Sequence, residues 1–184
     1  MDDKKILFVD LDGTLIKEDL SNLAFSHSLK NYPHKTIFYL LVYLFKGKPY
    51  LKDKLSKNFT IPFEHLTFNK AAFDFIREVK NRHRAVYLIS GSHQILVDQI
   101  AKYLNIFFMS FGTRDNFNMI GKNKIKFIKE NLKIDDFDYL GNSHQDLPIW
   151  KYTKRAIYTN ASKKLIKIIK SLDFEEKEIP ANFS

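Results

Sequence analysis

Short apolar runs alternate with segments of helical periodicity along most of the chain, and this alternation limits the fold more than any other feature. The runs have the length of buried strands, whereas the segments between them carry apolar residues at spacings of three and four, as amphipathic helices do. Strands and helices in alternation predict an α/β fold with a doubly wound parallel sheet. The predicted strands are residues 5–10, 85–90, 106–111, 137–141 and 155–159, and the predicted helices are residues 73–80, 94–103 and 122–131.

One interval does not fit the alternation. The stretch from residue 11 to residue 84 is far longer than the dozen or so residues that a crossover between parallel strands needs. We therefore expect a cap of helices, residues 17–68, inserted into a core made of residues 1–16 and 69–184. The tail after Leu172 is expected to be frayed or loosely packed.

Charge and composition limit the classes of binding partner and of metal site that the chain could have. The net charge of +9 favours anionic partners, which include phosphate esters, acidic membrane surfaces and nucleic acid. The absence of cysteine excludes disulfides and thiolate zinc sites.

The N-terminus has no secretory pattern, so we expect a cytoplasmic location. The longest apolar run, residues 37–45, is shorter than the roughly 20 residues that span a bilayer, and predicts either a buried helix or an interfacial one.

Two carboxylates follow the first predicted strand, in the sequence Asp10-Leu11-Asp12-Gly13-Thr14. Ligand sites of open α/β sheets form at the carboxyl ends of strands. A carboxylate there can attack a phosphoryl group, and a second one can protonate the leaving oxygen and then deprotonate water. Gly13 permits a tight turn whose amides can hold phosphate. The motif predicts Asp10 as nucleophile and Asp12 as general acid and base, although an acidic turn has the same composition.

A hydroxyl residue ends the second predicted strand, in Ser90-Gly91-Ser92. Ser90 is a candidate ligand of a phosphoryl oxygen, and amides of a helix beginning after Gly91 would add donors. The same serine could instead cap that helix. Both interpretations remain open on these residues alone.

A lysine near the start of the helix at residues 122–131 could neutralise the nucleophile and the phosphate together. Lys122, Lys124 and Lys126 compete for this role. Any one of the 30 lysines and arginines of the chain is more often a solvated surface group.

Oxygen donors follow the fourth predicted strand, in Gly141-Asn142-Ser143-His144-Gln145-Asp146. The carboxylate of Asp146 and the amide oxygen of Asn142 are hard ligands of the kind that Mg²⁺ prefers. Together with Asp10 and Asp12 they form the predicted magnesium site. An Asx-rich turn is the structural alternative.

The four motifs, in this order at predicted strand ends, resemble those of the haloacid dehalogenase (HAD) superfamily over residues 6 to about 165. The resemblance implies a Rossmann-like sheet with a cap of the first type, and a Mg²⁺-dependent phosphatase acting through an aspartyl phosphate. It implies that Ser90 and Gly91 bind phosphate. The family spacing from Gly121 favours Lys124 for the third motif, with Lys122 as the alternative.

Asn142 stands where most phosphatases of this superfamily have Asp, which implies a weaker cation site. A narrower resemblance covers residues 47–55, 66–75 and 137–150, which are similar to the HAD domain fused to membrane prenyltransferases of the ubiquinone class. In that HAD domain, the resemblance implies, asparagine is the usual residue at the position of Asn142. This resemblance implies a lipid-linked or prenyl-pathway phosphate as substrate and peripheral contact with the inner face of a membrane.

Other functions fit the sequence less well. A dehalogenase would need neither Asp12 nor a magnesium ligand, and a phosphonate hydrolase would need a reactive cap lysine among Lys48, Lys52 and Lys54. No nucleic-acid-binding module is recognisable, so nucleic acid is not an expected partner. The remaining alternative is a catalytically retired HAD domain that acts as an adaptor. The partner that we expect is a small-molecule or lipid-linked phosphate, and the sequence does not predict the oligomeric state.

Overall fold

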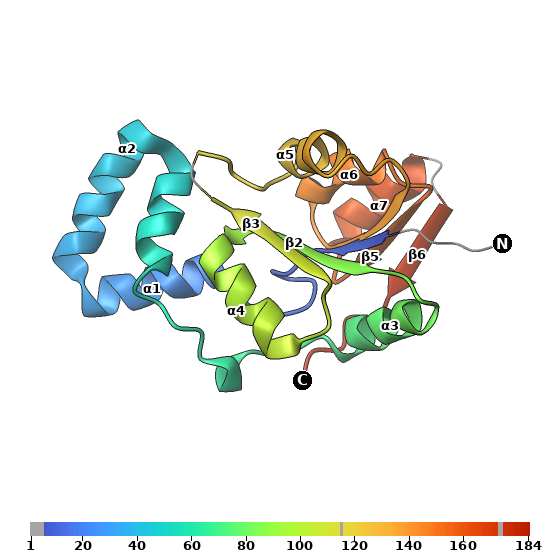
Figure 1. The fold of residues 1–184 in the computed structure, drawn as a ribbon, viewed down its shortest axis with the longest axis horizontal. Helices are drawn as coiled ribbons and strands as arrows, with labels where there is room; N and C mark the ends of the chain where they lie inside the picture. Colours follow the sequence, from blue (N-terminus) through green and yellow to red (C-terminus); the bar gives the residue numbers. More distant parts are fainter. Residues whose placement is uncertain (1–5, 115, 173–174) are drawn as a thin grey trace.

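The computed structural model describes residues 6–114, 116–172 and 175–184, and a six-stranded parallel sheet organises them (Figure 1). The strand order is β3-β2-β1-β4-β5-β6, so the first strand of the chain lies between β2 and β4. This confirms the predicted α/β class and all five predicted strands. The strands are β1 (Ile6–Val9), β2 (Val86–His93), β3 (Met109–Thr113), β4 (Phe137–Gly141), β5 (Arg155–Thr159) and β6 (Glu175–Ile179).

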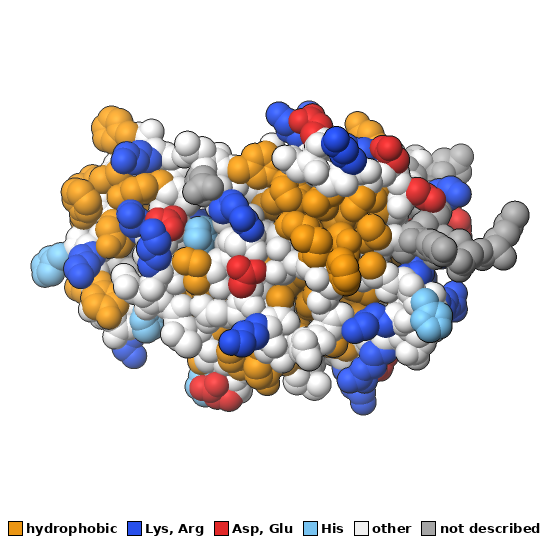
Figure 2. Space-filling view, viewed as in Figure 1, with side chains coloured by type: hydrophobic (Ala, Val, Ile, Leu, Met, Phe, Trp, Pro, Cys, Tyr) orange, Lys and Arg blue, Asp and Glu red, His pale blue; other side chains and the backbone are white. Residues whose placement is uncertain are grey.

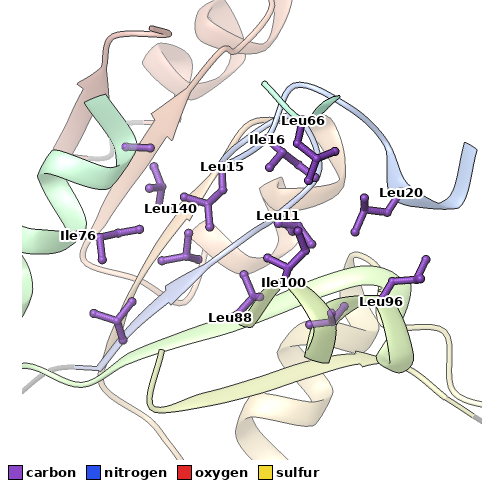
Figure 3. Close-up of a cluster of buried hydrophobic side chains, with 14 of the residues drawn as sticks. Leu11, Leu15, Ile16, Leu20, Leu66, Ile76, Leu88, Leu96, Ile100 and Leu140 are labelled. Carbon is purple, nitrogen blue, oxygen red and sulfur yellow. The ribbon is translucent and has the colours of Figure 1, made fainter. Parts of the chain in front are cut away.

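Both faces of the sheet are covered, which explains why β1 is apolar at every position. Leu7 and Val9 pack into one buried cluster and Phe8 packs into another, because successive side chains of a strand point to opposite faces. Helices α3 (Lys70–Asn81) and α4 (Gln94–Leu104) cover the first cluster, which Figure 3 shows in close-up. The second is covered by α5 (Lys122–Lys126), the π-helical turn η2 (Phe127–Asn131), α6 (Leu147–Trp150) and α7 (Lys163–Ser171).

Two long helices occupy the stretch between β1 and β2. These are α1 (Leu20–Asn31) and α2 (Pro33–Ser56), followed by the short 3-10 turn η1 (Phe63–His65). Gly47 kinks α2, with φ of 76° and ψ of 179°, a conformation that is essentially restricted to glycine. The exact division at residues 17 and 68 stays a prediction. Among the helices of the described ranges, none is both long enough and apolar enough to cross a membrane.

The C-terminal tail contradicts the expectation of a loosely packed end. Residues 175–179 form β6, which pairs with β5 along its whole length, and the backbone of Ser184 exchanges two hydrogen bonds with Phe68. The prediction was wrong because the sequence of β6, EEKEI, has little apolar pattern. The backbone of β6 pairs with the N–H and C=O groups at the open edge of β5, and backbone pairing does not require a particular residue type. Residues 173 and 174 lie outside the described ranges.

Candidate active site

The carboxyl ends of β1, β2 and β4 meet at a cavity of about 290 Å³. Among its lining residues are six that the sequence predicted from separate motifs. Ser90 is not among the lining residues, whereas Ser92 is. The predicted residues that line it are Asp10, Asp12, Gly91, Lys124, Asn142 and Asp146.

Asp10 lies directly after β1 and is almost completely buried. Its Oδ1 is 2.6 Å from Nζ of Lys124. Burial raises the pKa of Asp10 to about 7; the Lys124 ammonium opposes this shift, and the nearby Asp146 carboxylate adds to it. The cavity therefore holds a carboxylate that needs a positive charge beside it to remain ionised.

Lys124 is the lysine of its helix that reaches Asp10. It is 4% exposed, whereas Lys122 and Lys126 face solvent. Its Nζ also donates to the hydroxyl oxygen of Tyr139, at 2.7 Å, and lies 3.9 Å from Oδ1 of Asp146. The geometry thus agrees with the family spacing that favoured Lys124.

Tyr139 connects Lys124 with Asp146. Its hydroxyl accepts from Lys124 and donates to Oδ1 of Asp146, at 2.6 Å. The other oxygen of Asp146 accepts from the backbone amides of Asn142 and Ser143, at 3.0 and 2.9 Å. Asp10, Lys124, Tyr139 and Asp146 therefore form one continuous polar chain. The sequence motifs do not identify Tyr139, and the available signal is its place near the end of β4, before the Asn142 motif.

Asp12 faces the insertion rather than the Asp146 side. Its Oδ1 accepts from the backbone amide of Leu20, the first residue of α1, at 2.9 Å. Its Oδ2 accepts from the hydroxyls of Ser90 and Ser92, at 2.9 and 2.8 Å. Burial raises the pKa of Asp12, and the bond from Leu20 opposes that shift. Ser90 thus holds Asp12 in place, and Ser92, which we had not assigned, shares this role.

The helix predicted at residues 94–103 is present as α4, whereas the strand before it is longer than predicted. Strand β2 continues to His93, and α4 begins at Gln94. The amide of Ser92 donates to the hydroxyl of Ser90, at 3.0 Å, so it is already engaged. At this position Gly91 instead offers its carbonyl oxygen, which accepts from Nζ of Lys52 at 2.6 Å and from the hydroxyl of Thr113 at 2.7 Å.

Helices α1 and α2 contribute a further wall of the cavity. Asp19 and Ser21 line it from the start of α1, and Lys48 and Lys52 line it from α2. Burial lowers the pKa of Lys52 to about 8. The sequence offers Lys48 and Lys52 both as candidate reactive lysines and as cations that the cap could present to a phosphate ester. Their helical spacing of four places both on one face of α2, which was the signal that they act together.

The donors at the cavity fit a magnesium ion. Asp10 and Asp146 both approach Lys124, so two carboxylates face the same space. Asn142 packs against Gly13, where a Cβ atom would collide with its amide nitrogen. Within the described ranges, no group of three or more His, Cys, Asp or Glu side chains is placed to hold a metal. Two carboxylates with neutral oxygens and water suit Mg²⁺, which usually keeps several waters.

Known proteins similar to this chain were found by sequence and by structure. An uncharacterized protein, y4nM, of Sinorhizobium fredii is 33% identical over 164 residues, which cover 84% of this chain but only 30% of that protein. A protein of unknown function from Bordetella pertussis has a similar structure, with a TM-score of 0.70, 13% identity, and coverage of 94% of this chain and 97% of that one.

A structure described as a phospho-aspartyl intermediate analogue of phosphoserine phosphatase has a TM-score of 0.55. It is 18% identical and covers 96% of this chain and 95% of that one. Structural similarity at such low sequence identity shows that the fold is shared. The family itself is shown by the match of residues 7–151, most of the chain, to the haloacid dehalogenase-like hydrolases. The chain therefore belongs to the haloacid dehalogenase-like hydrolase family.

Proposed function

We propose that this hydrolase is a Mg²⁺-dependent phosphatase that forms a covalent acyl phosphate on Asp10. The observation that carries the proposal is the position of Asp10, buried at the end of β1, 2.6 Å from the Lys124 ammonium and beside a second carboxylate, Asp12. A nucleophile, a cation for the phosphoryl charge and a proton carrier thus line one small cavity. The neighbouring structure described as a phospho-aspartyl analogue supports the same chemistry.

The two carboxylates have different roles in this proposal. Asp10 attacks phosphorus, the bond from phosphorus to the ester oxygen breaks, and protonated Asp12 gives its proton to the departing oxygen. Asp12 then takes a proton from water as the water oxygen attacks phosphorus, which releases inorganic phosphate and regenerates Asp10. The raised pKa of buried Asp12 favours the protonated form that the first step needs.

Four groups would hold the magnesium ion: the carboxylates of Asp10 and Asp146, the amide oxygen of Asn142 and the backbone carbonyl of Asp12. When bound, the ion screens the repulsion between the carboxylates and the phosphate. Lys124 keeps Asp10 ionised, and Tyr139 fixes the orientation of Asp146. Ser90 and Ser92 hold Asp12 toward α1, where a leaving group would lie.

The cavity supports a small, negatively charged head group as the substrate. Its volume of about 290 Å³ is at the lower end for ligand sites. Lys48 and Lys52 of α2 add positive charge to the wall of the cavity, and Asp19 adds one negative group. A lipid-linked or prenyl-pathway phosphate is a second substrate class, with its head group in the cavity and its apolar chain outside.

A panel of phosphate monoesters tests the proposal. Phosphoserine, sugar phosphates and prenyl phosphates would be assayed with Mg²⁺ and after removal of metal by a chelator. We expect release of inorganic phosphate that stops on chelation and returns with Mg²⁺. Hydrolysis that continues at full rate in excess chelator would refute the metal dependence, and no release from any ester would refute the phosphatase.

A further inference from the structure

The first half of α2 carries exposed apolar side chains in the segment before Gly47. They belong to Ile37, Phe38, Leu41, Leu44 and Phe45. At 100° per residue, these five positions fall within about 120° of the helix surface. We call these five residues the α2 apolar face. A contiguous exposed face of this kind marks an interaction site. The exposed fractions are 53% for Ile37, 58% for Phe38, 58% for Leu41, 72% for Leu44 and 90% for Phe45.

The surroundings of the α2 apolar face carry positive charge. From Leu20 to Lys52 the sequence contains five lysines and neither Asp nor Glu. Lys35 precedes the face and Lys46 follows it on the same helix, and Lys30 lies in the last turn of α1. Pairing with a second copy of this chain through this face would bring lysines against lysines. The charge therefore favours an anionic partner.

The face also lies at one end of the molecule. Figure 1 shows α1 and α2 projecting beyond the sheet, and Figure 2 shows hydrophobic, Lys and Arg side chains gathered at that end. A projecting helix can place apolar side chains among lipid headgroups without needing a complementary groove in its partner. Apolar residues on a helix with adjacent lysines are the features of helices that lie in a membrane interface.

We propose that the α2 apolar face docks on an anionic lipid bilayer. The five apolar side chains enter the boundary between headgroups and acyl chains, and Lys30, Lys35 and Lys46 contact the headgroup phosphates. This docking goes beyond the proposed phosphatase and does not depend on it. Lys48, which lines the cavity, follows Phe45 by three residues, or at most about 11 Å of chain. The docked protein thus holds its cavity close to the bilayer surface.

Flotation with vesicles tests the docking. The protein would be mixed with vesicles of phosphatidylcholine alone, or of phosphatidylcholine with phosphatidylglycerol, at low and high salt. We expect binding to the anionic vesicles that weakens with salt, because salt screens the lysines. Leu44→Ser combined with Phe45→Ser should lower partitioning at least about tenfold. Lys35→Gln and Lys46→Gln should each lower it about fivefold.

Phe108→Ser is the matched control, because Phe108 is 73% exposed but precedes β3, far from α2 in the sequence. This variant should bind vesicles like the unchanged protein. Circular dichroism and hydrolysis of a soluble ester should be unchanged in the α2 variants, which separates failed docking from failed folding or failed catalysis. Absence of binding to anionic vesicles at low salt, equal binding to neutral vesicles, or equal losses with Phe108→Ser would each overturn the proposal.

Discussion

Lys52 of α2 donates a hydrogen bond to the backbone carbonyl of Gly91 in β2, with 2.6 Å between Nζ and the oxygen. A second bond from the same ammonium reaches Oδ1 of Asn118, at 2.9 Å. These bonds tie the helical insertion to the sheet at the wall of the cavity. Lys52 is therefore placed both to keep the insertion closed over the cavity and to present a positive charge to a substrate.

Substitution of Lys52 by methionine tests this double role. We expect KM for an anionic phosphate ester to rise roughly tenfold, since hydrogen bonds to charged groups contribute about 1.5–3 kcal/mol. The fold should tolerate the change, because the Gly91 carbonyl keeps its bond from Thr113. Lys54→Met is the control: Lys54 is on the same helix but is not among the residues lining the cavity. Equal KM values for the two variants would contradict the role of Lys52.

The pH dependence of Lys52 gives an independent check. Its pKa is lowered to about 8 by burial, so the ammonium is present below pH 8 and is lost as pH rises through that value. The ratio of kcat/KM between the unchanged protein and Lys52→Met should therefore be at its maximum near pH 7 and should fall to one by about pH 10. A ratio that stays constant over this range would show that the charge of Lys52 does not contribute. The charged groups facing Lys52 are Asp12, Asp19, Lys48 and Lys124.

Tyr139→Phe should separate catalysis from stability. It removes the hydroxyl between Lys124 and Asp146, and loss of such a supporting bond typically costs 10–100-fold in metal affinity or activity. We expect kcat to fall by that order and the concentration of Mg²⁺ for half-maximal rate to rise. Tyr158→Phe is the control, because it also removes a tyrosine hydroxyl, one that bonds to Glu176 on β6. If both variants lose the same activity, the polar chain has no specific role.

Asn142→Asp tests the neutral ligand of the proposed metal site. A third carboxylate beside Asp10 and Asp146 should bind Mg²⁺ more tightly, because charged ligands raise cation affinity. The variant should need less Mg²⁺ for half-maximal rate, measured in a titration with one ester. An unchanged or higher requirement would place Asn142 outside the metal site.

The sheet and most cavity residues could be predicted because the motifs follow strand ends. Parallel strands bring their carboxyl ends to one edge, so Asp10, Asn142 and Asp146 meet there whatever the details of packing. The burial of Lys52 was not predictable in this way. It depends on the course of α2, which bends at Gly47, and no local pattern records that angle.

Other features depend on partners distant in the sequence. β6 forms because β5 leaves an open edge, and its own residues carry little signal for a strand. The length of β2 was underestimated because Gly91 and Ser92 are typical of a turn, whereas pairing with β3 continues to His93. That extension brings Ser92 to Asp12.

The covalent bond to Asp10 is the central claim, and a rapid-quench experiment tests it most directly. The unchanged protein, quenched during turnover of an ester with Mg²⁺, should carry a phosphoryl group, whereas Asp12→Asn should slow both its formation and its hydrolysis by on the order of a hundredfold or more, because Asp12 acts in both steps. Peptide mapping by mass spectrometry should then find one phosphoryl group on Asp10, and Asp10→Asn should show neither the phosphoryl group nor turnover. Near-normal activity of Asp10→Asn, or a phosphoryl group on another residue, would contradict the mechanism.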